Sequence, residues 1–218
     1  MIAIIAGVII APDKPLSTNS SVARIAALVG SHPQQEALGG TLSVLGAVLF
    51  LGYAAPIAHR LRLSNRSAPL AFWLLGAAGA FAIFATLDVV VINALDFASR
   101  QGSLTGEPEL TRMMYHLYNG LLMPGAAHVA LAAYFAIFAI AARTRILTPQ
   151  WLAWPCAVLA PIAAVNGIVG LASPTGGTFP LAPLAVLGFV VVNVISSVSV
   201  LRERPASLDR SRLVRAAA

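Results

Sequence analysis

Residues 69–95 read PLAFWLLGAAGAFAIFATLDVVVINAL, a stretch in which Asp88 is the single charged residue. A helix needs roughly 20 consecutive apolar residues to cross the hydrocarbon core of a bilayer, and this stretch is longer than that. Its apolar residues do not alternate with polar ones, and they would lie on nearly every side of a helix, as in helices that face lipid and one another. The stretch therefore predicts a transmembrane α-helix.

Apolar stretches of this kind recur along the whole chain. Residues 1–11 are also apolar, but as a helix they would rise only about 16 Å, about half the thickness of a bilayer. We expect them to form a short first membrane helix, with a re-entrant or interfacial segment as the alternative. The predicted fold is an all-α, polytopic transmembrane helix bundle of six helices, in which this segment precedes five strong spans: residues 41–58, 69–95, 117–142, 151–172 and 181–201.

The composition indicates one membrane domain over the whole chain. Hydrophobic residues make up 58% of the sequence and charged residues only 10%, whereas soluble domains carry about 25% charged residues. A water-soluble fold would therefore lack polar side chains for its surface. The polar parts are a predicted outer loop, residues 12–40, and a basic tail, residues 202–218. Within the loop, residues 22–29 are weakly amphipathic, and we expect them to lie flat on the membrane.

The orientation of the bundle follows from the arginines, because short loops rich in Lys and Arg stay on the cytoplasmic side of a membrane. The opposite side is expected to hold Lys14, Arg24, Arg100 and Arg112, which are accompanied by acidic residues. We therefore expect a multi-pass protein of the cytoplasmic membrane whose C-terminus is cytoplasmic. The cytoplasmic clusters are Arg60, Arg62 and Arg66, then Arg143 and Arg145, and then Arg202, Arg204, Arg210, Arg212 and Arg215.

The formal charge of +6 does not indicate a nucleic-acid partner, because the basic residues lie beside apolar spans and are not interleaved with exposed aromatics. The expected partner is the lipid bilayer, and a homo-oligomer or a membrane partner subunit stays open. Trp73, Trp151 and Trp154 lie near the predicted cytoplasmic boundary, as an interfacial aromatic belt does. Tyr115 and Tyr118 lie near the outer boundary and are expected to form the second belt.

Two local patterns bear on helix geometry and packing. Pro108 suits a first helical turn, so the helix that follows it is expected to begin outside the membrane, and Pro124 with Gly125 should kink that helix. Small residues recur at four-residue spacing, a pattern that permits close contact between membrane helices: Gly39, Ser43 and Ala47 in one predicted span and its approach, and Gly76 and Ala80 in the next.

Asp88 is the only acidic residue well inside a predicted span, and an intramembrane carboxylate is costly enough to be a functional hypothesis by default. Counting from the outer helix ends, Asp88 lies about 10 Å deep, His128 roughly 16 Å and Asn166 about 9 Å, so these side chains can meet in the outer leaflet. Asn193 continues a polar stripe toward the cytoplasm. These four residues are the candidate ligand or proton site.

Three hypotheses about these residues stay open. In the first, they form interhelical hydrogen bonds that hold together a non-enzymatic accessory or sensory protein. In the second, Asp88 and His128 exchange a proton or bind a polar solute in a small proton-linked transporter or channel. A third and weaker alternative is a membrane-embedded enzyme that acts on lipid from the outer leaflet. No residue is assigned a catalytic role.

No cofactor or metal is expected from the residues present. A bis-histidine haem needs two histidines that face one iron, but His116 and His128 would lie about 18 Å apart along one helix. A retinal Schiff base needs a lysine inside the membrane, and Lys14 lies in a loop. The two glutamates near His116 match no specific metal site. Cys156 is the single cysteine, so no disulfide forms within one chain, and a small buried apolar role is expected.

The layout also resembles a known group of proteins. The chain has a short apolar start, a polar outer loop, paired helices that flank residues 59–66, and the sequence RTRILTPQWLA at residues 143–153, where the fifth helix begins. In these features it resembles small uncharacterised bacterial integral membrane proteins of about six helices, which are common in actinobacteria. The resemblance implies the same fold and location, and it carries over no catalytic or ligand-binding residue.

Overall fold

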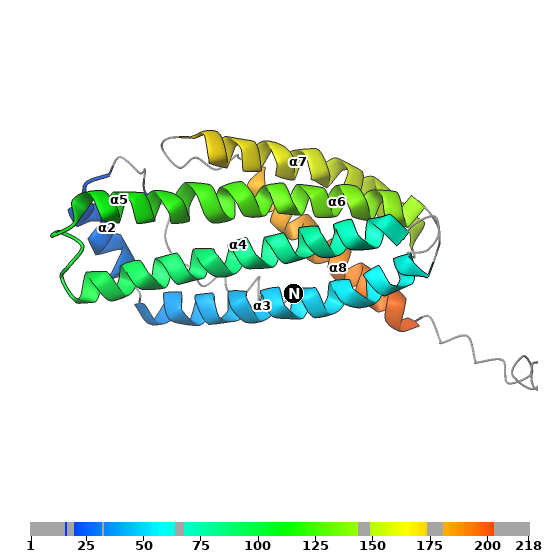
Figure 1. Cartoon of the computed structure of the whole chain (residues 1–218), viewed down its shortest axis with the longest axis horizontal. Coiled ribbons are helices and arrows are strands. Elements are labelled where there is room, and N and C mark those ends of the chain that lie inside the picture. Colours follow the sequence, from blue (N-terminus) through cyan, green and yellow to red (C-terminus); the bar gives the residue numbers. More distant parts are fainter. Residues whose placement is uncertain are drawn as a thin grey trace, which may run out of the picture.

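The computed structural model describes residues 16, 20–31, 33–63, 68–143, 149–173 and 181–202, and within these ranges the chain is helical with no strand. The helices run side by side along one axis and make an elongated bundle (Figure 1). In chain order they are α2 (Val22–Val29), α3 (Pro33–Arg62), α4 (Ala68–Arg100), α5 (Pro108–His116), the π-helix η1 (Leu117–Ala127), α6 (His128–Arg143), the short 3₁₀-helix η2 (Gln150–Leu152), α7 (Ala153–Ala172) and α8 (Ala182–Arg202).

Four helices of the described chain are long and apolar enough to cross a membrane. In α8 the apolar part, Pro183–Ser199, is shorter. Each of the five predicted strong spans coincides with a helix, so the predicted all-helical fold is confirmed for the described residues. The predicted first segment, residues 1–11, and the basic tail from residue 203 lie outside the described residues. The four long helices are Ala37–Arg62, Ala68–Arg100, the continuous Pro108–Arg143 and Gln150–Ala172.

The stretch predicted as an outer loop, residues 12–40, is helical over much of its described part. The helix α3 already begins at Pro33, a residue that suits a first helical turn because it has no N–H to leave unpaired. Ser21 caps the helix α2 by accepting a hydrogen bond from the first turn. The apolar side chains of α2, including Ile25 and Val29, are buried against α4 and α5. The apolar face of α2 therefore covers protein, and the expectation that this segment lies flat on the membrane stays a prediction.

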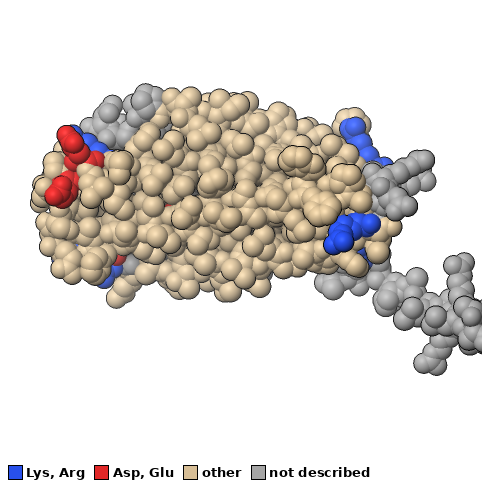
Figure 2. Space-filling model, viewed as in Figure 1, with Lys and Arg blue, Asp and Glu red and all other residues tan. Residues whose placement is uncertain are grey.

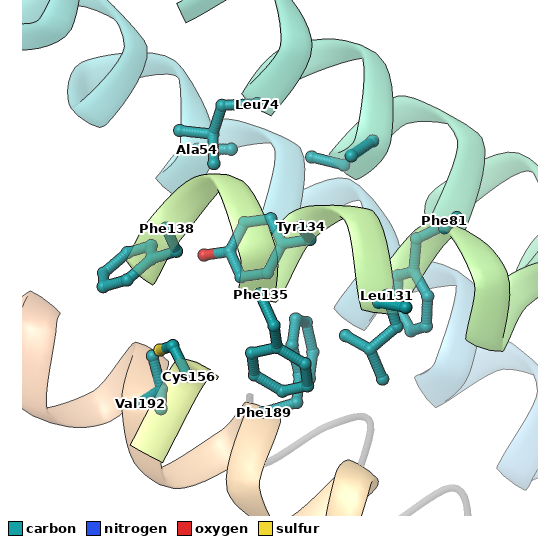
Figure 3. Close-up of a cluster of buried hydrophobic side chains, with 14 of the residues drawn as sticks. Ala54, Leu74, Phe81, Leu131, Tyr134, Phe135, Phe138, Cys156, Phe189 and Val192 are labelled. Carbon is teal, nitrogen blue, oxygen red and sulfur yellow. The ribbon is translucent and has the colours of Figure 1, made fainter. Parts of the chain in front are cut away.

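Consecutive long helices are neighbours in the order α3, α4, α6 and α7, and α8 crosses the far side of the bundle next to α7 (Figure 1). Aromatic rings fill the centre. Phe189 of α8 contacts Phe50 of α3 and Phe81 of α4, with ring centroids 4.8 and 5.2 Å apart. It also contacts Tyr134 and Phe135 of α6, at 5.8 and 6.4 Å. Figure 3 shows Phe81, Phe135 and Phe189 in the same space between the helices, and we call the five rings the aromatic cluster.

Apart from Asp88, the charged side chains whose positions are described lie at the two ends of the bundle. The face in Figure 2 is almost free of charge between these ends, and many large apolar side chains of the long helices are exposed. One end carries Arg60 and Arg62 from α3 and Arg143 from α6, and we call it the arginine end. The opposite end carries both signs of charge, and we call it the mixed-charge end. Its charged residues are Arg24, Asp96, Arg100, Glu107, Glu109 and Arg112.

The aromatic residues near the two ends differ in their exposure. Trp73, Trp151 and Trp154 near the arginine end are 69%, 55% and 70% exposed, as a belt facing lipid headgroups would be. The guanidinium of Arg143 lies 5.5 Å from the centre of the Trp154 ring. Tyr115 near the mixed-charge end is only 1% exposed. The prediction that Tyr115 belongs to a second belt is therefore wrong, because its ring is buried between helices.

Small residues permit close helix contacts at some of the positions in the predicted pattern, since Ala47 is fully buried, and at other positions as well. A Cβ atom at Gly76 would meet nothing within 4 Å, so the predicted close contact at this residue is wrong. A Cβ atom at Gly40 would lie 2.7 Å from Val89 of α4, and one at Gly188 would lie 2.4 Å from Leu159 of α7. The spacing of small residues does not reveal which side of an all-apolar helix faces a neighbour.

Candidate functional site

An eleven-residue π-helix, η1, interrupts the long helix that runs from α5 to α6. Most π-helical turns are single-turn bulges, and they are frequent at functional sites. The local sequence explains the irregular backbone, since Pro124 has no N–H to donate and Gly120 and Gly125 carry no side chain. The departure from α-helix geometry thus includes the residues at which the sequence predicts a kink.

The helix α7 contacts η1 at the level of the backbone. A Cβ atom at Gly170 would lie 2.7 Å from the main-chain carbon and oxygen of Pro124, and one at Gly167 would lie 2.8 Å from the main-chain nitrogen of Val129. Only glycine fits at these two positions. The adjacent Asn166 donates a hydrogen bond from Nδ2 to the Pro124 carbonyl, at 3.4 Å. The Gly-x-x-Gly stretch of α7 therefore places Asn166 directly on η1.

Asp88 lies on the face of α4 that packs against η1. Phe84 comes one turn before it on this face and Ile92 and Leu95 come after it, and these side chains pack in one apolar cluster with Leu122 of η1. The Asp88 side chain is half-buried, and its Oδ1 atom has no contact with the surface. Removing a carboxylate from water costs free energy, so Asp88 has the largest cost of burial among the four candidate residues.

His128 follows η1 directly as the first residue of α6. Its side chain is 6% exposed, its Nε2 atom is buried, and its main-chain N–H donates to the carbonyl of Gly125. Three of the four candidate residues therefore surround η1, with Asp88 on α4, His128 at the end of η1 and Asn166 on α7. An acid, an imidazole and an amide so placed are able to exchange a proton or bind a polar solute.

Asn193 lies in a different environment from the other three candidates. It is fully buried in α8, where the Tyr134 hydroxyl donates to its Oδ1 at 2.8 Å and its own Nδ2 donates to the carbonyl of Phe189 at 2.6 Å. Asn193 comes one turn after Phe189, toward the arginine end. The predicted polar stripe is therefore interrupted by the aromatic cluster, and Asn193 pairs with the hydroxyl of Tyr134, one of the five rings of that cluster.

A second polar group lies beside Asn193. The hydroxyl of Tyr53 in α3 is buried and has no hydrogen-bond partner of good geometry in the described chain, although the hydroxyls of Ser196 and Ser197 are near it. Both serines donate to carbonyls of their own helix, those of Val192 and Asn193, at 2.7 Å. Two tyrosines and three polar residues of α8 therefore form a polar layer between the aromatic cluster and the arginine end.

Four polar residues of the interior do not follow from the sequence analysis: Tyr53 and Tyr134 in this layer, and Tyr115 and Asn119 at the mixed-charge end. The side chains of Tyr115 and Asn119 are 1% and 4% exposed, and both bond to the main chain of Leu16. All four could have been predicted from the sequence, because the polar group of a tyrosine or asparagine in an apolar span needs a hydrogen-bond partner.

The other residues that could bind a metal or react, which include Cys156 and Asp96, form no site in the described part of the chain. No group of three His, Cys, Asp or Glu side chains there is placed to hold a metal ion. Cys156 is buried and not in a disulfide. Asp96 pairs with Arg100 one turn later at the mixed-charge end. Comparison with protein families, with curated proteins and with solved structures gives no match for this chain.

Proposed function

We propose that this chain is a multi-pass protein of the cytoplasmic membrane and a non-enzymatic accessory or sensory protein. The observation that carries this proposal is the apolar surface between two charged ends (Figure 2), which matches a protein surrounded by lipid. A buried interior held by side-chain hydrogen bonds supports the non-enzymatic role.

The arginine end is proposed to face the cytoplasm. Its described charges, Arg60, Arg62 and Arg143, are all positive, whereas the opposite end mixes acidic and basic residues. An excess of Lys and Arg in short connections marks the cytoplasmic side. The exposed tryptophans near the same end suit the level of the lipid headgroups.

A second candidate function is proton-linked handling of a small polar solute at Asp88 and His128. The specific observation in its favour is that both side chains are placed at η1 with a buried polar atom each. Carboxyl and imidazole groups are both able to exchange a proton. The aromatic cluster lies between this site and the arginine end.

The variant Asp88→Asn distinguishes between the two proposed functions. An amide replaces a protonated acid as a hydrogen-bond partner, so an accessory protein with Asp88→Asn keeps its thermal stability in detergent to within about 0.5 kcal/mol. A proton-linked transporter loses its pH-dependent flux, which is measured in liposomes that contain a pH-sensitive dye.

The matched control is Asp96→Asn, the same chemical change two turns further along α4, where the acid pairs with Arg100. The second candidate function predicts that Asp96→Asn keeps the flux. It is excluded if the unmodified protein shows no pH-dependent flux, or if Asp88→Asn keeps it. The accessory role is contradicted if the flux exists and only Asp88→Asn abolishes it.

A further inference from the structure

The helices α6 and α7 meet at the arginine end, where Arg143 ends α6 and Trp154 lies in the first turn of α7 (Figure 1). Between them, Leu152 of η2 is buried in the hydrophobic core and fixes the start of α7. Trp154, two residues later, is exposed. The guanidinium of Arg143 lies over its ring, 5.5 Å from the ring centre, and we call these two residues the α6–α7 corner.

The charge of Arg143 has no acid beside it. Among the described residues, acidic side chains lie at the mixed-charge end, apart from Asp88 within α4. The Arg143 side chain is exposed, and its N–H donors have no acceptor in the described chain. A guanidinium over an aromatic ring still presents N–H donors in its own plane, in a fork that matches two oxygens of a phosphate. The α6–α7 corner is therefore suited to bind an anion.

An apolar stripe runs along α7 from this corner. The exposed positions that follow Trp154 are spaced by four and three residues, so they lie on one face of the helix. Their side chains are Val158, Pro161, Val165 and Ile168. From Trp154 to Val165 this face extends about 16 Å, close to half the thickness of the hydrocarbon core of a bilayer. The stripe thus has roughly the length of one lipid acyl chain.

A second arginine at the same end also lies over an aromatic ring. The guanidinium of Arg62, at the end of α3, is 5.9 Å from the ring centre of Phe72, an exposed residue near the start of α4. Phenylalanine has no N–H, whereas the indole of tryptophan carries a donor that suits the level of the lipid headgroups. The α6–α7 corner therefore offers hydrogen-bond donors from two side chains, and the Arg62 corner from one.

We propose that Arg143 and Trp154 bind the phosphate headgroup of an anionic phospholipid, whose acyl chain lies along the exposed face of α7. The cation, the donors and the apolar stripe are complementary to the charge, the phosphate oxygens and the acyl chain of such a lipid. A zwitterionic lipid fits the stripe equally well but has no net charge to pair with Arg143. This assignment rests on the proposed membrane location, because only a protein in a bilayer has lipid at this surface.

Quenching of tryptophan fluorescence by brominated lipids measures which lipid contacts Trp154. The chain has three tryptophans, and Trp73→Phe with Trp151→Phe leaves Trp154 as the single emitter. This variant is reconstituted into mixed vesicles of phosphatidylcholine and phosphatidylglycerol, in which one lipid or the other carries bromine on its acyl chains. The relative binding constant at Trp154 is expected to favour phosphatidylglycerol about fivefold, since one basic residue near a membrane surface has about this effect.

Two substitutions of Arg143 distinguish a specific site from general surface charge. Arg143→Gln removes the charge and is expected to abolish the preference for phosphatidylglycerol. Arg143→Lys keeps the charge but loses the planar fork of donors, so the preference is expected to fall about twofold or more. Full preference in Arg143→Lys would overturn the site, because charge alone would then account for the binding.

The matched control is Arg62→Gln, which changes the charge of the arginine end by the same amount as Arg143→Gln. It is expected to leave the lipid preference at Trp154 unchanged, and an equal loss in the two variants would overturn the site. Quenching by brominated phosphatidylcholine shows in each variant that Trp154 still faces lipid. If Arg143→Gln does not fold, the comparison of Arg143→Lys with Arg62→Lys decides between a site and general charge.

The lipid site and the membrane location fail in different ways. Equal quenching by the two brominated lipids overturns the lipid site and leaves the membrane location standing. Absence of quenching by either lipid contradicts the membrane location itself, and the site with it.

Discussion

Two tyrosines in the polar layer near the arginine end differ in what their hydroxyls contact. The hydroxyl of Tyr134 donates to Oδ1 of Asn193, and both residues are fully buried. The hydroxyl of Tyr53 is equally buried but lacks a hydrogen-bond partner of good geometry in the described chain. The Tyr134 hydroxyl therefore has a buried amide oxygen as its acceptor, whereas the hydroxyls nearest to Tyr53, those of Ser196 and Ser197, already donate to main-chain carbonyls.

Replacing each tyrosine with phenylalanine tests this difference at the scale of a residue. Tyr134→Phe leaves Oδ1 of Asn193 without its donor, and we expect a loss of about 1 kcal/mol in the free energy of unfolding. Tyr53→Phe leaves the nearby Ser196 and Ser197 with their own main-chain acceptors, so its loss of stability is expected to be smaller. Thermal unfolding in detergent measures both, and equal losses in the two variants contradict the assignment.

At the scale of an element, the π-helix η1 depends on the glycines of α7. The backbones of η1 and α7 approach so closely that a Cβ at Gly170 would overlap the main chain of Pro124. Main-chain atoms cannot turn away as a flexible side chain can. The contact also brings Asn166 to η1, so the position of this candidate residue depends on a glycine four residues later.

Alanine at Gly170 is expected to separate α7 from η1, with a cost of about 1–3 kcal/mol for overpacking. Gly52→Ala in α3 is the matched control, because a Cβ there would meet nothing within 4 Å. This control is expected to be neutral, or stabilising by up to about 1 kcal/mol through helix propensity. The unfolding temperatures of the two variants are compared in the same detergent. An unchanged unfolding temperature for Gly170→Ala would show that the close approach of α7 to η1 does not contribute to stability.

At the scale of the whole molecule, the distribution of charge predicts which end faces which side of the membrane. Ser103 lies in the exposed connection between α4 and α5 at the mixed-charge end, and Gln150 lies exposed before α7 at the arginine end. Because the arginine end is proposed to be cytoplasmic, Ser103→Cys should react with an impermeant maleimide on intact cells. Gln150→Cys should react only after permeabilisation.

Both variants are made with Cys156→Ala, although the native Cys156 is buried. Each variant is the control for the other, since they differ only in the end of the bundle that carries the cysteine. The opposite pattern of labelling would reverse the proposed orientation. Labelling of both sites on intact cells with unbroken membranes would contradict a membrane-spanning bundle.

The sequence by itself determines where the helices are and where the charges lie. Helix length and apolar composition are properties of a single segment, so residues 69–95 identify α4 without reference to any other part of the chain. The same holds for the exposed tryptophans and for the arginines that end α3 and α6. At Pro124 and Gly125 the sequence predicts a kink, and the structure has the π-helix η1 there.

Only the tertiary structure decides which polar residues meet. A helix that is apolar on nearly every side has no periodicity that shows which face turns inward, so its rotation is set by packing against distant segments. For this reason the sequence grouped Asn193 with Asp88, while the aromatic cluster interrupts the predicted polar stripe and Tyr134 takes Asn193 as its partner. For the same reason Tyr115 was assigned to the lipid interface, although its hydroxyl binds Leu16 in the interior.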